Sequence, residues 1–556
     1  MKKFLALVIG VAFLGSSLTT VHADVIPDEQ WVKTGPTADG GSWGINTADG
    51  FESPAAYLTS TKADNYDPNT GKTISVSTCT SFENSVCPHD EYQYFETPLS
   101  FCATATDFDC VKDVFATKDD GTKLDFKFVR NFPETNKYAY KGDRLAKLPN
   151  SGYSVVVDIP GAPHAGGSLY LINAVLAGHR FPSDKTFSVD RMYVDIKAVT
   201  FAASRQEPPR PILDVSKGSS FMSVNRAGDT NCSVQCSSTE NAVAQTFPTG
   251  IKFGVHLRLN AAVSGWLNGR VSKVESSISK DEDGMQNVIV SGYPVQVPIV
   301  FGWVQKSSAP QSLKDYYGAM TPREVNGGNG FGKCLDPSRA PDAPNGPCDP
   351  LYWESVLRSP QKNAKDMREI ATWLPVLNDT ALVAPTYWNI NATDSNLYQN
   401  CAKDSTQLLG IVTTNASSFV SGPPVFNKAE GILDYQVLAP HYLKDKSTFL
   451  GTYDLAIKSD FARCIYGFSS APISAKVSII SADGTNQVAT VITNESNGWI
   501  HLGAYGFTFS SPTVRVKLSQ EAPTPAPNPK VTKVAAPLKK FTIVCARGKA
   551  IKKVTG

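Results

Sequence analysis

The sequence predicts a mainly β protein with two or more antiparallel, sandwich-like domains, a small helical insertion and stabilising disulfides. Short runs of β-branched and aromatic residues recur along the chain, separated by Asp-Gly, Asn-Gly or proline-rich turns. Strands do not alternate with helices in the pattern of a doubly wound α/β fold, so that class is not expected. The chain has eleven cysteines, most of them close to another in sequence, as in disulfide-stabilised exported proteins.

Composition narrows the classes of function. The 556 residues are 41% hydrophobic and 10% aromatic, which is enough chain and apolar surface for two to four folded domains and argues against intrinsic disorder. A net charge of +2 argues against a nucleic-acid binder. Because no motif identifies a reaction, we expect no cofactor and no bound metal.

The first 23 residues have the three parts of a secretory signal. Lys2 and Lys3 precede the apolar run Phe4–Leu14, and Val21-His22-Ala23 has small residues where a signal peptidase cuts. The alternative is a retained membrane anchor, but the run of about eleven residues is shorter than the roughly 20 needed to cross a bilayer. We therefore expect export, a mature chain that starts at Asp24, and no transmembrane span.

Short spacing between cysteines suggests a disulfide scheme. The chain has no CxxC motif and no zinc-finger spacing, so oxidation is a better interpretation than metal binding. Proximity favours Cys79–Cys87, Cys102–Cys110, Cys232–Cys236, Cys334–Cys348 and Cys401–Cys464. The first four cysteines allow three connectivities, so their pairing stays open. Cys545 is left over.

Three Asp-Gly turns predict antiparallel hairpins with one buried face. They join Val114–Ala116 to Lys123–Phe128, Val274–Ile278 to Val288–Val290, and Ala475–Ile480 to Gln487–Thr493.

A helical insertion is predicted around residues 309–378. Ser359-Pro360 is typical of a helix start, and an apolar stripe follows from Ala364 to Leu374. With Leu313–Met320 and Leu351–Leu357 as further helices, we expect a small helical cover over a sheet.

Proline-rich segments and changes of pattern suggest boundaries, with Glu207–Pro211 as a hinge. The predicted segments are a signal peptide (1–23), an N-terminal β domain (24–210), a second β domain or its continuation (211–308), the helical insertion with a disulfide loop (309–378), a C-terminal β domain (379–520), a proline-rich linker (521–540) and a basic tail (541–556).

Charge is concentrated at the C-terminus. Residues 530–556 contain no acidic residue and eight basic ones, Lys530, Lys533, Lys539, Lys540, Arg547, Lys549, Lys552 and Lys553. Subtracting these eight charges and the two signal lysines from the net +2 leaves −8 for residues 24–529. The near-neutral total therefore joins an acidic body to a basic tail.

Two glycine-rich motifs invite a catalytic interpretation. Gly40-Gly41-Ser42-Trp43-Gly44 fits the GxSxG pattern of a nucleophile elbow, but it has no buried strand before it, so a surface turn is favoured. Gly328–Gly332 resembles a phosphate-binding loop, yet it runs into a cysteine and Pro337 instead of a helix. We expect a plain loop there.

Acidic clusters and histidines give weak signals. Asp64, Asp67 and Asn69, and likewise Asp281–Gly284, resemble calcium fragments, but each is shorter than a calcium loop and is better explained as a hairpin turn. Among the histidines, His164 is expected in a loop and His256 in a strand. A catalytic triad assembled from distant residues stays open.

Aromatic residues and acids could serve a glycan site. Glu354 and Glu369, beside Trp353 and Trp373, are the first acids to test in a glycosidase, although exposed helix positions are the simpler interpretation. Tyr387-Trp388 and Trp266 could stack on sugars, but core packing is favoured.

The last fifth of the chain shows a family resemblance. Residues 462–474 read ARCIYGFSSAPIS, a Gly-Trp pair follows at 498–499, and residues 503–512 read GAYGFTFSSP. With the end segments TIVCARGK and KKVTG, they resemble a module of uncharacterised secreted proteins of actinobacteria, and residues 254–271 are a weaker echo. In that family a second cysteine follows the lysines. This sequence stops before that position, which would explain why Cys545 has no partner. The resemblance implies export and a surface location, and it implies no catalytic residue.

The favoured hypothesis is therefore a non-catalytic exported protein, secreted or associated with the cell surface or matrix, that binds a partner or polysaccharide through its β domains. The basic tail would hold it to cell-wall polymer or lipid headgroups. The alternative is a secreted hydrolase that acts on glycans.

Overall fold

The computed structural model of the chain describes residues 28–36, 40–49, 56–61, 66–67, 72–73, 76–82, 87, 90–134, 136, 138–203, 210–212, 223–225, 235–236, 240–319, 328–335, 352–393, 401, 408–468, 473–480, 486–487, 490–509, 513–520, 542–547 and 550–555. The predicted signal peptide and proline-rich linker lie outside these residues. Among the described residues, no helix is both long enough and apolar enough to cross a membrane.

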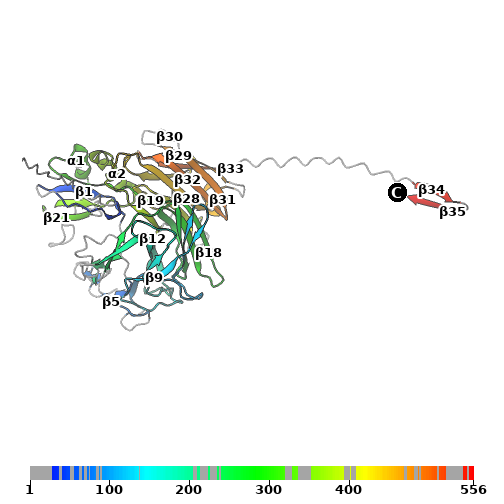
Figure 1. The fold of residues 1–556 in the computed structure, drawn as a ribbon, viewed down its shortest axis with the longest axis horizontal. Helices are drawn as coiled ribbons and strands as arrows, with labels where there is room; N and C mark the ends of the chain where they lie inside the picture. Colours follow the sequence, from blue (N-terminus) through cyan, green and yellow to red (C-terminus); the bar gives the residue numbers. More distant parts are fainter. Residues whose placement is uncertain are drawn as a thin grey trace, which may run out of the picture.

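The protein is mainly β, as predicted, and antiparallel pairing predominates (Figure 1). The largest sheet takes strands from residue 57 to residue 508, and its strands pair in a closed arrangement. The predicted domain boundaries stay predictions. The strands of this sheet are β2 (Tyr57–Thr61), β5 (Val76–Thr78), β6 (Tyr92–Pro98), β7 (Cys110–Lys118), β8 (Lys123–Leu124), β9 (Lys127–Phe132), β10 (Ser154–Asp158), β11 (Leu169–Arg180), β12 (Ser188–Ala203), β15 (Gln235–Cys236), β16 (Glu240–Ala244), β17 (Ile251–Leu259), β18 (Gly265–Lys280), β19 (Gln286–Gln296), β23 (Thr386–Thr393), β24 (Leu408–Thr414), β28 (Leu450–Lys458), β31 (Thr490–Ser496) and β32 (Trp499–Thr508).

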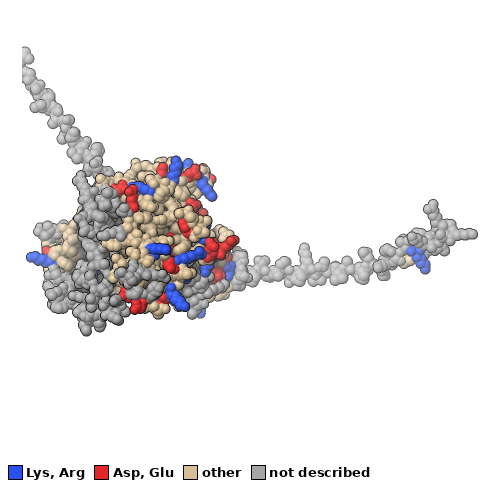
Figure 2. Space-filling view, turned by 90° about the horizontal axis from the view of Figure 1, so that it is seen from below, with Lys and Arg blue, Asp and Glu red and all other residues tan. Residues whose placement is uncertain are grey.

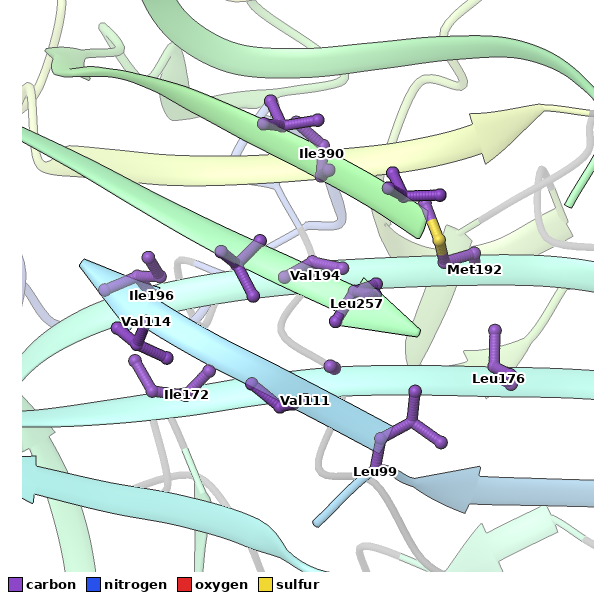
Figure 3. Packing of buried hydrophobic residues seen from close by; sticks show 14 of the residues in the cluster. Leu99, Val111, Val114, Ile172, Leu176, Met192, Val194, Ile196, Leu257 and Ile390 are labelled. Atoms are coloured by element: carbon purple, nitrogen blue, oxygen red, sulfur yellow. The ribbon is translucent and has the colours of Figure 1, made fainter. Parts of the chain in front are cut away.

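Alternating residues of these strands build the main core. Ile172 of β11, Val194 of β12, Val114 of β7 and Leu257 of β17 are fully buried in one cluster, and Figure 3 shows their side chains gathered between the strands. Burying an aliphatic side chain of this size stabilises the fold by about 1.5–3 kcal/mol. The period-two pattern in the sequence therefore corresponds to the face of the sheet that packs inward.

Two of the three predicted Asp-Gly hairpins are confirmed. β7 pairs with β8 through Ala116 and Leu124, and β18 pairs with β19 around Gly284, which has a positive φ of 79°. The third prediction is only partly confirmed: β29 pairs with the two residues of β30, but Thr490–Thr493 belong to β31, which pairs with β32 in the largest sheet, and Asp483-Gly484 lies outside the described residues. A six-stranded sheet holds β29 and β30 and packs on a second core with α3 (Ser459–Tyr466). Its strands are β25 (Ser418–Phe419), β26 (Val425–Asn427), β27 (Ile432–Leu438), β29 (Ile473–Ile480), β30 (Asn486–Gln487) and β33 (Thr513–Gln520).

A separate four-stranded sheet lies at one end of the body, in the order β20-β1-β22-β21 (Figure 1). Its strands are β1 (Ser42–Asn46), β20 (Phe301–Gln305), β21 (Gly328–Cys334) and β22 (Trp353–Arg358). One face packs against the helices α1 (Gln311–Gly318) and α2 (Ala364–Trp373) in a cluster that contains Ile45, Leu313 and Ile370. The helical insertion therefore covers a sheet, as expected.

Three local expectations in this region are wrong. Residues 353–358 form β22 and not a helix, because pairing with β1 and β21 satisfies the backbone of this β-branched and aromatic run. Residues 328–334 form the partner strand and not a loop. Helix α2 starts later than Ser359, because Asn363 caps it by accepting a hydrogen bond from the backbone N–H of Asp366 at 2.9 Å.

Three of the five expected disulfides are present: Cys79–Cys87, Cys102–Cys110 and Cys401–Cys464. The third ties residue 401 to α3. For the expected pairs Cys232–Cys236 and Cys334–Cys348, Cys232 and Cys348 lie outside the described residues.

The predicted basic tail contains an antiparallel hairpin of β34 (Thr542–Arg547) and β35 (Ala550–Thr555), drawn in red in Figure 1. Of its basic residues, Lys530, Lys533, Lys539, Lys540 and Lys549 lie outside the described residues, and Lys553 is exposed. The remaining short elements are η1 (Asp28–Gln30), η7 (Pro375–Leu377), β3 (Tyr66–Asp67) paired with β4 (Lys72–Thr73), and β13 (Arg210–Ile212) paired with β14 (Ser223–Asn225).

Candidate functional site

The eight tryptophans divide sharply by location. Four are buried in cores: Trp266, Trp373, Trp388 and Trp499, each with an exposed fraction of 5% or less. The other four are only half-buried, and all lie on or against the four-stranded sheet: Trp31, Trp43, Trp303 and Trp353. Large aromatic rings that stay partly exposed on one small sheet are typical of a binding surface.

The face of this sheet turned away from α1 and α2 carries Trp31 and Trp303, whereas Trp43 packs on the helical side against Tyr317 of α1, with ring centroids 4.7 Å apart. Trp303 of β20 meets Phe331 of β21 edge-on, with ring centroids 5.8 Å apart, and Trp31 meets Phe301 of β20 at 5.5 Å. The indole Nε1 of Trp303 donates a hydrogen bond to the Thr34 carbonyl oxygen at 2.8 Å, which fixes the ring orientation. We call Trp31, Phe301, Trp303 and Phe331 the tryptophan face.

Glycines let two rings lie close to the sheet. Gly44 of β1 is paired with Trp303, and a Cβ on Gly44 would come within 2.6 Å of the indole ring. A Cβ on Gly330 would come within 2.2 Å of Trp353. Since real Cβ atoms do not approach so closely, each ring rests against backbone that only glycine leaves open.

A buried polar network fixes the opposite side of the sheet. Arg358 of β22 binds Glu369 of α2 through two hydrogen bonds, from Nε at 3.0 Å and Nη2 at 3.1 Å, and both side chains are fully buried. The Tyr317 hydroxyl donates to Glu369 at 2.9 Å and accepts from the Trp373 indole at 2.8 Å. Burial opposes the charge of Arg358, but the bonds to Glu369 and its charge raise the pKa of Arg358 above its ordinary value.

The structure places both acids that were singled out from the sequence. Glu369 is buried in α2 and held by a cation, so it is neither an exposed helix residue nor available as a general acid. Glu354 lies in strand β22, where its carboxylate accepts the backbone N–H of Lys333 at 3.2 Å. Glu369 is thus engaged by Arg358 and Tyr317, and Glu354 by the backbone of Lys333.

A second charged cluster joins the β1–β2 connection to the large sheet. Asp49 accepts a hydrogen bond from Arg270 Nε at 2.7 Å and contacts Lys362. Burial would raise the pKa of Asp49, but the two cations lower it below its usual range. Burial lowers the pKa of Lys362 to about 8 against the attraction of Asp49. The cluster therefore holds its charges in ion pairs.

The other predicted site residues have structural roles. Ser42 is buried inside strand β1, where its backbone N–H donates to Ser355 Oγ at 2.9 Å, so the GxSxG pattern forms neither an elbow nor the expected turn. Tyr387, Trp388 and Trp266 are buried, which confirms core packing. As expected, His164 lies in a loop and His256 in β17.

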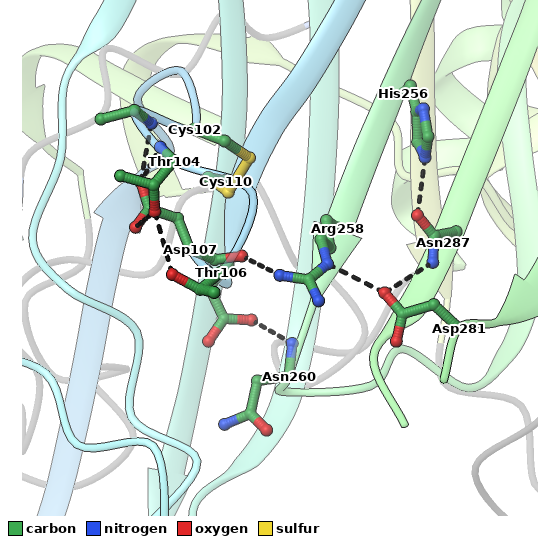
Figure 4. Close-up of a disulfide and its surroundings, with 12 residues drawn as sticks. Cys102, Thr104, Thr106, Asp107, Cys110, His256, Arg258, Asn260, Asp281 and Asn287 are labelled. Carbon is green, nitrogen blue, oxygen red and sulfur yellow. Dashed lines mark hydrogen bonds and ion pairs between the residues drawn. A yellow bond between two sulfur atoms is a disulfide. The ribbon is translucent and has the colours of Figure 1, made fainter. Parts of the chain in front are cut away.

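The calcium-like fragment at 281–284 is a hairpin turn, as the simpler interpretation had it. Arg258 donates to Asp281 at 2.9 Å (Figure 4) and also to Asp283 at 2.6 Å. Slight burial opposes ionisation of Asp281, but the bond from Arg258 lowers its pKa to about 2. Asp64 and Asn69 lie outside the described residues, within which no group of three or more His, Cys, Asp or Glu side chains could hold a metal ion.

No protein-family model, curated protein or solved structure matches this chain. Only its geometry therefore indicates what the tryptophan face does. Sequence reasoning missed it, because its rings come from residues 31 to 331, and only the pairing of β1, β20, β22 and β21 brings them together. The one local signal was a tryptophan directly beside a glycine in two segments, Ser42–Gly44 and Gly302–Trp303.

Proposed function

We propose that this protein is exported and binds polysaccharide without catalysis, through the tryptophan face. The observation that carries the proposal is that the half-buried Trp31 and Trp303 and the exposed Phe331 gather around buried Phe301 on one small sheet, with Gly44 beneath Trp303. Four other tryptophans, Trp266, Trp373, Trp388 and Trp499, are buried. The C–H groups of a sugar ring carry slight positive charge and pack on the negative face of an aromatic ring. A flat, fixed ring binds without loss of its own conformational freedom.

Export is supported by the signal-like N-terminus and by three disulfides, which persist in oxidising compartments. Location at the cell surface is part of the same proposal.

Figure 2 shows acidic and basic side chains interspersed on the described part of one face, and the body carries −8 outside the basic tail. An uncharged polymer is therefore the better ligand for the body.

Binding of the oxidised full chain to suspensions of cellulose, chitin, xylan and amylose tests the proposal. We expect retention on at least one polymer, and a loss of affinity of about tenfold or more for Trp303→Ala, as for the central aromatic of an interface. Phe128→Ala is the matched control, because Phe128 is an exposed ring (54%) away from this sheet. Equal binding by Trp303→Ala and the parent chain would contradict the proposal.

The basic tail is proposed as the tether. Its eight cations would hold the chain to anionic wall polymer or lipid headgroups, each contributing about 1 kcal/mol at low ionic strength. Removal of residues 521–556 should release the protein from cells, and salt should release the full chain. Unchanged, salt-insensitive association would show that the tail is not the tether.

We do not extend the proposal to a glycan hydrolase. Of the acids considered for one, Glu369 is bound to Arg358 inside the helical cover, and Glu354 of β22 accepts the backbone N–H of Lys333. The described residues thus give the binding function the better support.

A further inference from the structure

A second aromatic cluster lies on the large sheet, at the turn between β11 and β12. Phe181 is 51% exposed although it is a large apolar residue. Its ring centroid lies 4.6 Å from that of His179 in β11 and 5.5 Å from that of Tyr92 in β6, and the last two rings are stacked at 5.7 Å. The three rings therefore form one exposed corner.

Buried contacts hold this corner in place from below. Arg180 is only 2% exposed, and its Nε donates to the side-chain oxygen of Gln93 at 3.1 Å. Its Nη1 donates to the carbonyl oxygens of Phe181 at 3.3 Å and Asp184 at 2.9 Å, at the two ends of the turn. The Asp184 N–H closes the turn onto the Phe181 carbonyl at 2.9 Å. The exposed ring is thus presented by a fixed turn, which lowers the entropic cost of binding a ligand.

Polar groups border the rings. His179 Nδ1 lies 2.8 and 2.7 Å from the two carboxylate oxygens of Asp190 in β12, whose side chain is 42% exposed. Each carboxylate oxygen keeps lone pairs that can accept further hydrogen bonds from a hydroxyl group. Burial, together with the charge of Asp190, raises the pKa of Tyr92 to about 12, so its hydroxyl stays protonated near neutral pH.

We infer that Tyr92, His179, Phe181 and Asp190 form a second ligand-binding surface that takes a sugar ring of an uncharged polysaccharide. Ring faces beside an exposed carboxylate suit a ligand that has both C–H faces and hydroxyl donors. An anionic polymer is disfavoured because Asp190 lies at the surface and the body carries −8. The ligand class rests on the proposed function, whereas the site itself is independent of the tryptophan face.

Phe181→Ala tests the inference in the full oxidised chain, on the same suspensions of cellulose, chitin, xylan and amylose. We expect the variant to lose affinity about fivefold or more for a polymer that the parent chain binds. Phe128→Ala is the matched control, since the two phenylalanines are 51% and 54% exposed. An unfolding curve for each variant tests whether the fold is kept. We expect that it is, because the Phe181 ring lies mostly outside the core.

The outcomes separate the two binding surfaces. Wild-type affinity of Phe181→Ala overturns the second surface, whatever Trp303→Ala does. Loss by Phe181→Ala with none by Trp303→Ala supports the second surface and overturns the tryptophan face. If the parent chain binds none of the four polymers, both proposals fail. If Phe181→Ala keeps polymer binding but loses self-association in sedimentation, the corner is a contact between copies and the sugar site is overturned.

Discussion

Buried and half-buried carboxylates in this protein have two kinds of surroundings. Glu369 and Asp49 face cations, and the guanidinium groups of Arg358 and Arg270 bind them through two hydrogen-bonding atoms each. Asp109, beside the Cys102–Cys110 disulfide, instead accepts the backbone N–H groups of Asn260 and Ala261 at 2.8 and 3.0 Å. We therefore expect removal of the charge to lower the stability of the fold at Glu369, and to reduce a loss of stability with rising pH at Asp109.

Glu369→Gln should destabilise the fold strongly. The change leaves the fully buried Arg358 without a counter-charge, and loss of one partner of a buried pair typically costs about 3–5 kcal/mol. Urea unfolding measures the difference. Glu354→Gln is the control at a partly exposed acid and should change stability by less than about 0.5 kcal/mol. Similar small effects of both variants would show that the Arg358–Glu369 pair does not hold the sheet to α2.

Asp109→Asn should reduce the loss of stability with rising pH. Burial raises the pKa of Asp109 to about 7, against the opposing effect of the two N–H groups. Above about pH 4 the unfolded chain releases this proton while the folded protein keeps it, so unfolding becomes easier up to pH 7, by at most about 1.4 kcal/mol per pH unit. The asparagine variant lacks this dependence.

Part of the slope should remain in that variant, because burial also raises the pKa of Asp454 to about 7. Thermal unfolding between pH 4.5 and 8 measures the slope, with the exposed Asp113→Asn as control. A slope identical to that of the parent chain would show that Asp109 is ionised in the folded protein.

At the scale of elements, local signals predicted what local chemistry decides. The Asp-Gly turns placed hairpins such as β18–β19 correctly, because a turn and two alternating runs carry the whole signal. The helix expected in this way at residues 353–358 was wrong, since these residues form a strand that depends on pairing with β1, some 310 residues earlier in the chain. Likewise Glu369 looked exposed in sequence because its partner Arg358 becomes visible only after α2 folds onto β22.

Gly44→Ala tests the glycine beneath the tryptophan face. The added methyl group would meet the Trp303 ring at 2.6 Å, so the ring must move, at a cost of about 1–3 kcal/mol. We expect lower stability and weaker polysaccharide binding together. Gly35→Ala is the control, because no atom lies within 4 Å of a Cβ there. Unchanged binding by Gly44→Ala would mean that the ring position does not matter.

At the scale of the whole molecule, three disulfides cross-link segments of the described chain. The Cys401–Cys464 bridge closes a sequence separation of 63 residues, whereas Cys79–Cys87 closes 8. On the chain-entropy model these bridges contribute about 4 and 2.5 kcal/mol respectively. Replacing both cysteines of the longer bridge by serine should therefore lower the urea midpoint more than the same change at the shorter one. The reverse order would show that loop closure does not govern the stability of this fold.

The tryptophan face is also a property of the whole chain. Four segments between residues 31 and 331 supply its rings and the glycine beneath them, so neither its existence nor its exposure follows from any one stretch of sequence. The composition showed only that the chain has eight tryptophans. The fold separates the four that pack cores from the four that remain accessible.

Quenching of tryptophan fluorescence by acrylamide, with and without a bound polysaccharide, tests the central claim most directly. Because the other four tryptophans are buried, we expect the quencher to reach mainly the half-buried rings at the four-stranded sheet. We predict that ligand binding protects part of this fluorescence in the full chain, and that Trp303→Ala loses both the protection and most of the affinity. Tight binding with unchanged quenching would contradict the account, because the sugar would then lie elsewhere on the molecule.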